Sequence, residues 1–309
     1  MGTQCIRVNK LLKQYGSTRA VDQLSFSVEE GQVFGLLGPN GAGKSTTVEI
    51  LVGLQGRDGG CVEVASMDPA SQGEELRRVL GVQLQSPALF PRLTVDELTQ
   101  LFASFYPDPF PAKRAIEMLG LEGKKDVRVQ HLSGGQRQRL SLVLAIISHA
   151  RILFLDEPTA GLDPQSRRLV WDTITLLKDL GTTIVLTTHF MDEAEYLCDE
   201  VLIIDQGKRV AQGCPQRLIR EHFSVNAIEF EDPGFTEEEV GQLATLPGVT
   251  RQRLDESEQL TLYSTHAAET ISALMQFAED QNKALNGLHM RQPTLEDLFL
   301  KLTGRMIRE

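Results

Sequence analysis

The chain has 309 residues, enough for one large α/β domain with a small companion or for two domains of ordinary size. Hydrophobic residues make up 41% and charged residues 24%, which is the composition of a folded globular protein and excludes a largely disordered one. Against 31 Lys and Arg stand 42 Asp and Glu, so the formal net charge of −11 repels the nucleic-acid backbone and argues against binding to DNA or RNA.

The cysteines and the N-terminal sequence indicate the cellular compartment in which the protein acts. Cys5, Cys61, Cys198 and Cys214 stand singly, with no CxxC pair or other metal-ligand spacing, which favours free thiols in a reducing cytosol. The first residues lack the basic-then-apolar pattern of a signal peptide. The longest apolar run, 140–147, is far shorter than the roughly 20 residues that span a bilayer. If the protein serves a membrane, we expect it to act from one side through a partner.

Short apolar runs alternate with helical patterns through the first part of the chain. Residues 32–37 predict a strand. Glycine-rich sequence follows it, and a helical pattern begins at residue 44. Two further buried-type strands, 151–156 and 182–188, flank a helical stretch at 165–180. This strand–helix–strand order predicts an α/β domain with a parallel sheet.

The remaining segments predict a helical insertion and a second domain. Residues from about 92 to 150 read as several helices, and the first of them opens on a threonine N-cap. A pair of strands meets around Gln206 and Gly207, and the pattern changes near residue 222. Beyond it, the order βαββαβ followed by a closing helix predicts a small ferredoxin-like α+β module. We therefore expect one domain over 1–221 and an accessory domain over 222–309.

A glycine-rich loop, residues 38–46 (GPNGAGKST), matches G-x-x-x-x-G-K-[ST] between a predicted strand and helix, and is called the nucleotide loop below. Its N–H groups suit the α- and β-phosphates of a nucleotide, Lys44 reaches the β/γ oxygens, and the Ser45 hydroxyl can bind Mg²⁺. An ordinary glycine turn is the plainer alternative. The residues expected to bind ATP here are Gly38, Pro39, Asn40, Gly41, Ala42, Gly43, Lys44, Ser45 and Thr46.

An acidic pair, Asp156 and Glu157, lies at the C-terminal end of an apolar strand in residues 152–158 (ILFLDEP). Carboxylates at the C-terminal end of a strand lie where open α/β sheets bind ligands. Asp156 is expected to hold Mg²⁺ through its water, and Glu157 to act on the water that attacks the γ-phosphate. Such a pair can also be only a solvated turn. The nucleotide loop nearby makes that reading a poor explanation.

A second phosphate cradle occurs at residues 132–136 (LSGGQ), called the signature segment below. Ser133 offers a hydroxyl, Gly134 and Gly135 expose N–H groups, and the helix that follows has a positive N-terminal end. Because the nucleotide loop already wraps one nucleotide, the second cradle points to a second molecule. Two copies arranged head to tail around a two-fold axis would each close the other's site. A helix start without any ligand is the alternative.

Together these motifs, in this order, resemble an ABC-type ATPase, the nucleotide-binding subunit of an ATP-binding-cassette transporter. The resemblance covers residues 1 to about 220. It implies ATP and Mg²⁺ as ligands, and ATP hydrolysis as the activity. It also implies that Ser133, Gly134, Gly135 and Gln136 act in trans on the γ-phosphate held by the partner subunit.

Several single residues gain a role only through this resemblance. Tyr15 matches the aromatic residue that stacks on adenine, His189 the switch histidine that reaches the γ-phosphate, and Asp163 a loop that crosses the dimer interface. The glutamine that senses Mg²⁺ is either Gln83 or Gln85. Gln85 fits better, because it alone leads into a loop with small residues and proline.

The resemblance implies a permease partner, to which the cassette binds at the cytoplasmic face of the membrane. The helical insertion and the loop after Gln85 are expected to form a groove for a permease helix. Segments such as the terminal PTLEDLFLKLTGR are similar to those of daunorubicin- and bacitracin-resistance exporters. This favours export of a drug, antibiotic, lipid or similar amphipathic molecule.

Two rival functions remain open from the residues. A soluble ABC mechanoprotein acting on ribosomes or nucleic acid would use the same motor, but usually has two cassettes, a long coiled coil or zinc-binding cysteines. A P-loop kinase for a small molecule would leave the signature segment and His189 without purpose. Salt-dependent nucleic-acid binding would favour the first rival, and a phosphorylated product the second.

Overall fold

The protein was analysed as a computed structural model that describes residues 3–85, 88–223, 226–254 and 259–304. The chain forms two compact units, one of Met1–Pro215 with Leu302–Glu309 and one of Gln216–Lys301. The expected domain start at residue 222 falls six residues after the start of the second unit. We describe each unit by itself.

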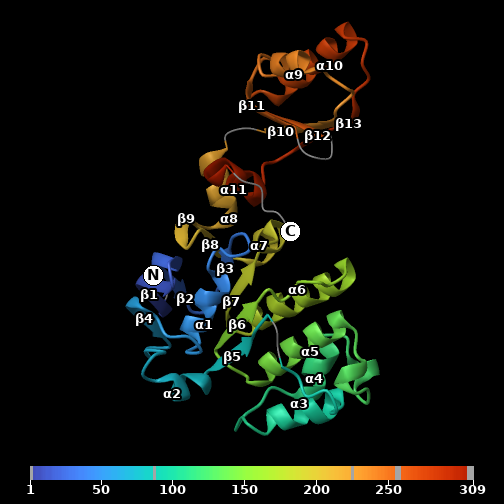
Figure 1. The fold of residues 1–309 in the computed structure, drawn as a ribbon. Coiled ribbons are helices and arrows are strands. Elements are labelled where there is room, and N and C mark those ends of the chain that lie inside the picture. The colour runs from blue at the N-terminus through green and yellow to red at the C-terminus, as the bar shows by residue number, and fades with distance from the viewer. Residues whose placement is uncertain (1–2, 86–87, 224–225, 255–258, 305–309) are drawn as a thin grey trace. The chain divides into compact units, whose positions relative to one another are not determined.

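A six-stranded sheet with the order β5-β6-β7-β3-β8-β9 forms the centre of the first unit (Figure 1). Every pair in it is parallel except β8 with β9. Strands β3, β6 and β7 are buried along their whole length, which explains their continuous apolar sequences. The expected parallel α/β sheet is confirmed. Its strands are β3 (Val33–Leu37), β5 (Leu80–Gln83), β6 (Ile152–Asp156), β7 (Thr183–Thr188), β8 (Glu200–Asp205) and β9 (Lys208–Gly213).

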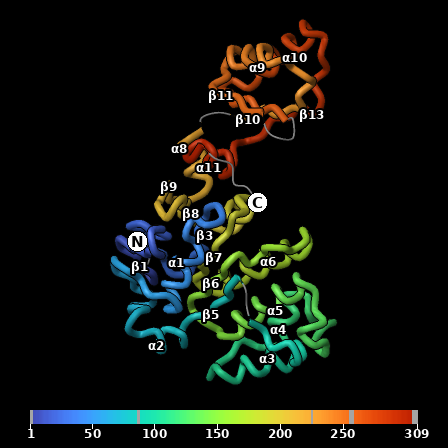
Figure 2. The backbone as a smooth tube through the Cα atoms, in the orientation of Figure 1, coloured from blue at the N-terminus to red at the C-terminus, as the bar shows by residue number. Residues whose placement is uncertain are grey.

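Helices accompany this sheet, and the expected helical insertion appears as α3, α4 and α5, which gather together in both views (Figures 1 and 2). Thr94 caps α3 with a reciprocal pair of bonds to Glu97, so the helix begins where its sequence predicts. The helices are α1 (Lys44–Leu51), α2 (Gly73–Arg77), α3 (Val95–Ala103), α4 (Ala112–Met118), α5 (Gly134–Ile147), α6 (Pro164–Asp179) and α7 (Met191–Leu197).

An antiparallel sheet that the sequence analysis did not predict forms from the N-terminal segment. Its order is β2-β1-β4, with β1 (Gln4–Tyr15), β2 (Thr18–Glu29) and β4 (Gly59–Val64). Register shifts after Val8 and Leu11 interrupt the alternation that would have marked β1 as a strand. Ile6, Val8 and Leu11 nevertheless share one hydrophobic cluster with Phe34 of the parallel sheet.

The turn between β8 and β9 joins both sheets to the nucleotide loop. Gln206 and Gly207 have φ of 49° and 74°, as a tight hairpin turn requires, and the expected hairpin is confirmed. The Gly207 carbonyl accepts from the N–H of Asp22 (2.9 Å), and the Gly207 N–H donates to the Ala42 carbonyl (3.0 Å). The nucleotide loop is therefore held by a backbone hydrogen bond from this turn, and the turn is held by β2.

The second unit contains a four-stranded antiparallel sheet with the order β11-β12-β10-β13. With α9 and α10 in the crossovers, this is the ferredoxin-like βαββαβ arrangement that the sequence predicts. Its core includes Ile228, Phe230, Leu262 and Leu274. The elements are α8 (Pro215–His222), β10 (Asn226–Glu231), α9 (Glu237–Leu243), β11 (Val249–Leu254), β12 (Gln259–Ser264), α10 (Ala267–Asp280), β13 (Asn286–Arg291) and α11 (Leu295–Thr303).

Buried charges fasten α11 to this sheet. Tyr263 donates its hydroxyl proton to Asp297, which is 2% exposed. The Arg291 guanidinium donates to Oδ2 of Asp297 (2.5 Å) and to Oε1 of Glu229 (2.7 Å). Burial alone would raise the pKa of Asp297, but the hydrogen bonds from Arg291 and Tyr263 hold that pKa below its ordinary value. The ionised carboxylate is thus the form that stabilises the unit.

We predict that this unit loses stability as the pH falls below about 4, the ordinary pKa of an aspartate. Because the pKa of Asp297 is lower folded than unfolded, its contribution is full above the unfolded value and is lost as the pH falls through the folded one. Asp297→Asn removes the charged acceptor and should cost about 1.5–3 kcal/mol at neutral pH. Hydrogen exchange of the β10 and β12 amides measures both effects.

Asp280→Asn is the control for this prediction, because Asp280 lies at the exposed end of α10 and, within the described residues, accepts a hydrogen bond from Gln276 of the same helix (3.0 Å). It should change stability by no more than about 0.5 kcal/mol. Equal exchange rates in the Asp297 and Asp280 variants would contradict a stabilising role for Asp297.

Candidate active site

The nucleotide loop connects β3 to α1 through positions that only glycine can occupy. Gly43 has φ of 101°, and a Cβ there would lie 2.3 Å from the Ala20 carbonyl oxygen. A Cβ on Gly38 would lie 2.2 Å from the Ile204 carbonyl oxygen. These close approaches hold the loop around the N-terminus of α1, where the N–H groups of the first helical turn face an anion.

Lys44, the first residue of α1, is 4% exposed and folds back over the loop. Its Nζ donates to the carbonyl oxygens of Gly38 (2.8 Å) and Pro39 (3.2 Å), and lies 3.6 Å from Oε1 of Glu157. Burial lowers the pKa of Lys44, while the negative charges of Glu157 and Asp156 oppose that shift. The ammonium is therefore a buried charge whose partners are the loop carbonyls and an acidic side chain.

Asp156, at the end of β6, is 3% exposed and collects two hydroxyl groups. Its Oδ1 accepts from Ser45 Oγ of α1 (3.2 Å) and from Thr187 Oγ1 of β7 (2.5 Å). Three elements thus meet at one carboxylate. The paired hydroxyl and carboxylate oxygens of Ser45 and Asp156 are the donors that Mg²⁺ prefers, so these residues fit the ion.

The described ranges of the chain hold no group of three or more His, Cys, Asp or Glu side chains that could bind a metal by themselves.

The carboxylate of Glu157, the next residue, lies among three polar side chains. Oε1 is 3.6 Å from Lys44 Nζ and 3.3 Å from Nδ1 of His189, an ion-pair distance that does not meet hydrogen-bond geometry. Oε2 accepts from Nε2 of Gln85 (3.2 Å). At 7% exposure, this carboxylate is buried beside the loop that the sequence assigns to the phosphates.

Gln85, which the sequence favours, and Gln83, the alternative, occupy different environments. Gln83 is 1% exposed within β5, and neither of its amide atoms has a hydrogen-bond partner among the described residues. Gln85 lies two residues further on, beyond the end of the strand, and reaches Glu157. The structure therefore brings Gln85, and not Gln83, to the acidic pair.

The backbone of Glu157 is itself unusual, with φ of 50° in the left-handed region. Its N–H donates to Oγ1 (3.0 Å) and to the carbonyl (3.2 Å) of Thr187. Its carbonyl accepts from Nε2 of Gln138 on α5 (3.1 Å). A strained non-glycine residue of this kind persists only where its surroundings hold it, and such residues cluster at functional sites.

Tyr15 lies at the end of β1, where it pairs with Thr18 across the β1–β2 hairpin. Its side chain is 47% exposed, with Lys13 Nζ 5.2 Å from the ring centroid. The close approach of Ala20 to Gly43 brings the same hairpin to the nucleotide loop. The Tyr15 ring is thus exposed on a hairpin that contacts the nucleotide loop, and an exposed aromatic ring is suited to stacking.

The signature segment leads directly into α5, with Ser133 as the N-cap. Ser133 Oγ accepts from the N–H of Gln136 (3.2 Å), and the Gln136 side chain accepts from the N–H of Ser133 (3.0 Å). The hydroxyl accepts in this bond, so its own proton stays available to a phosphate oxygen. Gly134 is exposed, and a Cβ there would meet nothing within 4 Å. The cradle therefore faces open space.

Asp163 is the exposed N-cap of α6 and accepts from the N–H (2.9 Å) and hydroxyl (2.7 Å) of Ser166. The bonds from Ser166 hold the pKa of Asp163 below its ordinary value. Neither Ser133 nor Asp163 bonds to the nucleotide loop in the part of the chain that the structure describes. The structure thus gathers the loop, Glu157, Gln85 and His189 in one place, and leaves these two caps outside it.

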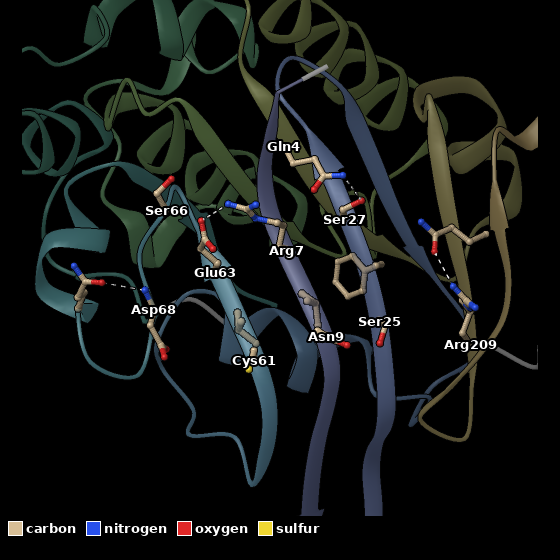
Figure 3. Close-up of a pocket in the computed structure, with 15 residues that line it drawn as sticks. Gln4, Arg7, Asn9, Ser25, Ser27, Cys61, Glu63, Ser66, Asp68 and Arg209 are labelled. Atoms are coloured by element: carbon tan, nitrogen blue, oxygen red, sulfur yellow. Dashed lines mark hydrogen bonds and ion pairs between the residues drawn. The ribbon is translucent and has the colours of Figure 1, made fainter. Parts of the chain in front are cut away.

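A broad hollow of about 750 Å³ lies elsewhere, on the open face of the β2-β1-β4 sheet (Figure 3). Its side chains bond mainly to one another: Arg7 Nη2 lies 2.7 Å from Oε1 of Glu63, and Gln4 donates to Ser27 (3.3 Å). No residue of the nucleotide loop or the acidic pair lines it. Size alone therefore does not identify the catalytic site of this protein.

Sequence reasoning missed two residues that organise the site, Thr187 and Gln138. Thr187 left a weak signal, because it occurs in the TTH run that ends at His189. Gln138 left none, since it lies in a polar run, QRQR, whose direction depends on how α5 packs. Only the fold shows that both side chains converge on Glu157.

Comparison with known proteins agrees with this geometry. Residues 21–160 match the family model described as ABC transporter. A curated relative from Ralstonia nicotianae, named Nod factor export ATP-binding protein I, is 39% identical over 99% of this chain and 96% of its own length. The relative of the same name from Paraburkholderia xenovorans is 38% identical over the whole of both chains.

Solved structures are similar as well. An ATP-binding subunit of an ABC transporter superposes with a TM-score of 0.65 at 27% identity, over 71% of this chain and 93% of its own. A dimeric bacterial ABC transporter cassette does so with 0.61 at 25% identity, over 68% and 98%. The fold and the site thus define a P-loop ATPase of the cassette type. The chain belongs to the ABC transporter family, as an ATP-binding subunit that hydrolyses ATP.

We predict that Thr187→Val lowers the kcat of ATP hydrolysis at least about tenfold, because one hydroxyl links Asp156 to the N–H of Glu157 and each lost bond is worth about 1 kcal/mol. Valine keeps the volume of this fully buried side chain. Steady-state ATPase assays with thermal unfolding would measure the effect. Thr187→Ser keeps the hydroxyl and should retain most of the activity. Equal rates for the valine and serine variants would show that the hydroxyl has no such role.

Proposed function

We propose that this protein is the ATP-hydrolysing subunit of an exporter and that two copies act head to tail beneath a separate permease. The observation that supports this most directly is the position of the Glu157 carboxylate. It is buried next to the nucleotide loop, between Lys44, His189 and Gln85. These are the neighbours that a carboxylate needs if it is to orient water against a γ-phosphate.

In this proposal the chain's own residues hold and orient the reactants. The N–H groups of the nucleotide loop and the Lys44 ammonium bind the phosphates. Glu157 accepts a hydrogen bond from the attacking water, and His189 turns its ring toward the γ-phosphate. Ser45 and Asp156, with Gln85, would hold Mg²⁺, which would neutralise charge on the phosphates.

The second copy supplies what one chain leaves open. The Ser133 hydroxyl proton is not used in the capping bonds, and together with the N–H groups of Gly134 and Gly135 in the first turn of α5 it suits the γ-phosphate held by the partner copy. Asp163, exposed at the start of α6, is proposed to meet the same interface. The dimeric cassette among the similar structures supports this arrangement.

A hollow of about 470 Å³ suits the permease helix that the sequence predicts. It lies between residues 88–91 and the start of α5, and its lining includes Leu89, Pro91, Val129 and, at its rim with the signature segment, Gly134. Phe90 beside it is 54% exposed. No helix in the described ranges is long and apolar enough to cross a membrane. We therefore propose that this groove binds a permease at the cytoplasmic face of the membrane.

The names of the relatives favour a substrate class. Proteins 36% to 39% identical along nearly the whole chain are named for Nod factor export. We propose export of a Nod factor or a similar amphipathic molecule. The likeness to daunorubicin- and bacitracin-resistance exporters keeps a drug or antibiotic as a second proposal, because substrate contacts belong to the permease.

We predict that Glu157→Gln binds ATP with Mg²⁺, nearly abolishes turnover and accumulates a stable dimer, because the amide keeps the shape of the side chain but cannot serve as a base. Size-exclusion chromatography with light scattering, with and without ATP, measures the dimer. Adding Ser133→Ala to the same chain should weaken it.

A Glu157→Gln protein that binds ATP but stays monomeric, even in the presence of its permease, would contradict the head-to-tail arrangement. Retained turnover in the same variant would instead remove Glu157 from the role proposed for it.

A further inference from the structure

Gln138 connects the helix that carries the signature segment to the acidic pair of its own chain. Its Nε2 donates to the carbonyl oxygens of Glu157 (3.1 Å) and Pro158 (3.3 Å). Gln138 is five residues after Ser133, so only about 7 Å of helix separates the cradle from this contact, at 1.5 Å per residue. One short helical segment thus carries the signature segment at its start and contacts the acidic pair five residues later.

Glu157 needs such a contact because its backbone is in the left-handed region, which a side chain with a Cβ disfavours. Thr187 binds its N–H from β7, and Gln138 binds its carbonyl from α5. The two bonds hold the peptide groups on either side of the strained Cα. With one of them removed, the backbone could relax and turn the carboxylate away from Lys44 and Gln85.

We infer that Gln138 is a positioning residue for hydrolysis, holding the peptide carbonyl of Glu157 so that the carboxylate stays aimed at the attacking water. This inference rests on the proposed role of Glu157. It also has a consequence for the dimer. The helix that presents Ser133 and Gly134 to the partner's nucleotide fixes Glu157 in its own site, so a shift of that helix reaches both nucleotides.

The test is Gln138→Met, which keeps the length of the side chain but removes the donor. We expect kcat for ATP hydrolysis to fall about tenfold with KM for ATP unchanged, because the part-buried bonds to the Glu157 and Pro158 carbonyls are lost and the loop still binds the nucleotide. Gln138→Glu keeps the shape without the donor, and serves as the second variant if methionine prevents folding.

Arg139→Met is the matched control. Arg139 follows on the same helix and also donates to backbone carbonyls, those of Leu119 (2.8 Å) and Gly120 (3.3 Å), which belong to no catalytic residue. A merely structural role for Gln138 would lower the melting temperature as Arg139→Met does and leave kcat of the folded protein unchanged.

Unchanged kcat in the Gln138 variants, or a rise in KM alone, would overturn the inference. Glu157→Gln measured in parallel separates the two proposals. If it abolishes turnover while the Gln138 variants are normal, only the role of Gln138 is wrong. If it remains active, the role of Glu157 is wrong.

Discussion

Three charges buried beside the C-terminal ends of the central strands constrain the rest of the first unit. Lys44, Asp156 and Glu157 are each less than 8% exposed. Buried charges are costly unless they are paired and hydrogen-bonded. The ammonium is accordingly held by loop carbonyls and Glu157, and Asp156 by the hydroxyls of Ser45 and Thr187. Each of these partners comes from a different element, so the charges fix how the elements meet.

Close backbone packing also holds the nucleotide loop in a fixed conformation. Gly38, Gly43 and Gly207 each lie against a carbonyl oxygen of a neighbouring strand or hairpin, where a Cβ would collide. These contacts leave the loop little freedom before a ligand arrives. A preorganised array of N–H groups loses less entropy on binding than a flexible one, and its dipoles need no reorganisation during the reaction.

The second unit also pairs its buried charges. Asp297, Arg291 and Glu229 are held together under α11, and the core beneath the sheet is apolar. In this unit the buried ion pairs fasten one helix to one sheet. In the first unit the buried charges lie at the C-terminal end of the strands, beside the nucleotide loop.

The sequence by itself determined the class of protein and indicated the residues that we propose to bind a nucleotide. The nucleotide loop, the acidic pair and the signature segment are local patterns, since phosphate binding needs particular residue types at fixed spacing along one turn and one helix start. The order of strands and helices, including the ferredoxin-like module, followed from hydrophobic runs of ordinary length.

Tertiary structure decided the rest, because it depends on residues far apart in the chain. The β2-β1-β4 sheet escaped prediction where bulges broke the alternation of β1. The sequence favoured Gln85 over Gln83, but only the fold shows that Gln85 reaches Glu157, and the contact on which the role inferred for Gln138 rests depends on how α5 packs against the end of β6. Local spacing specifies which groups can bind a phosphate, whereas only the fold specifies which side chains hold those groups in place.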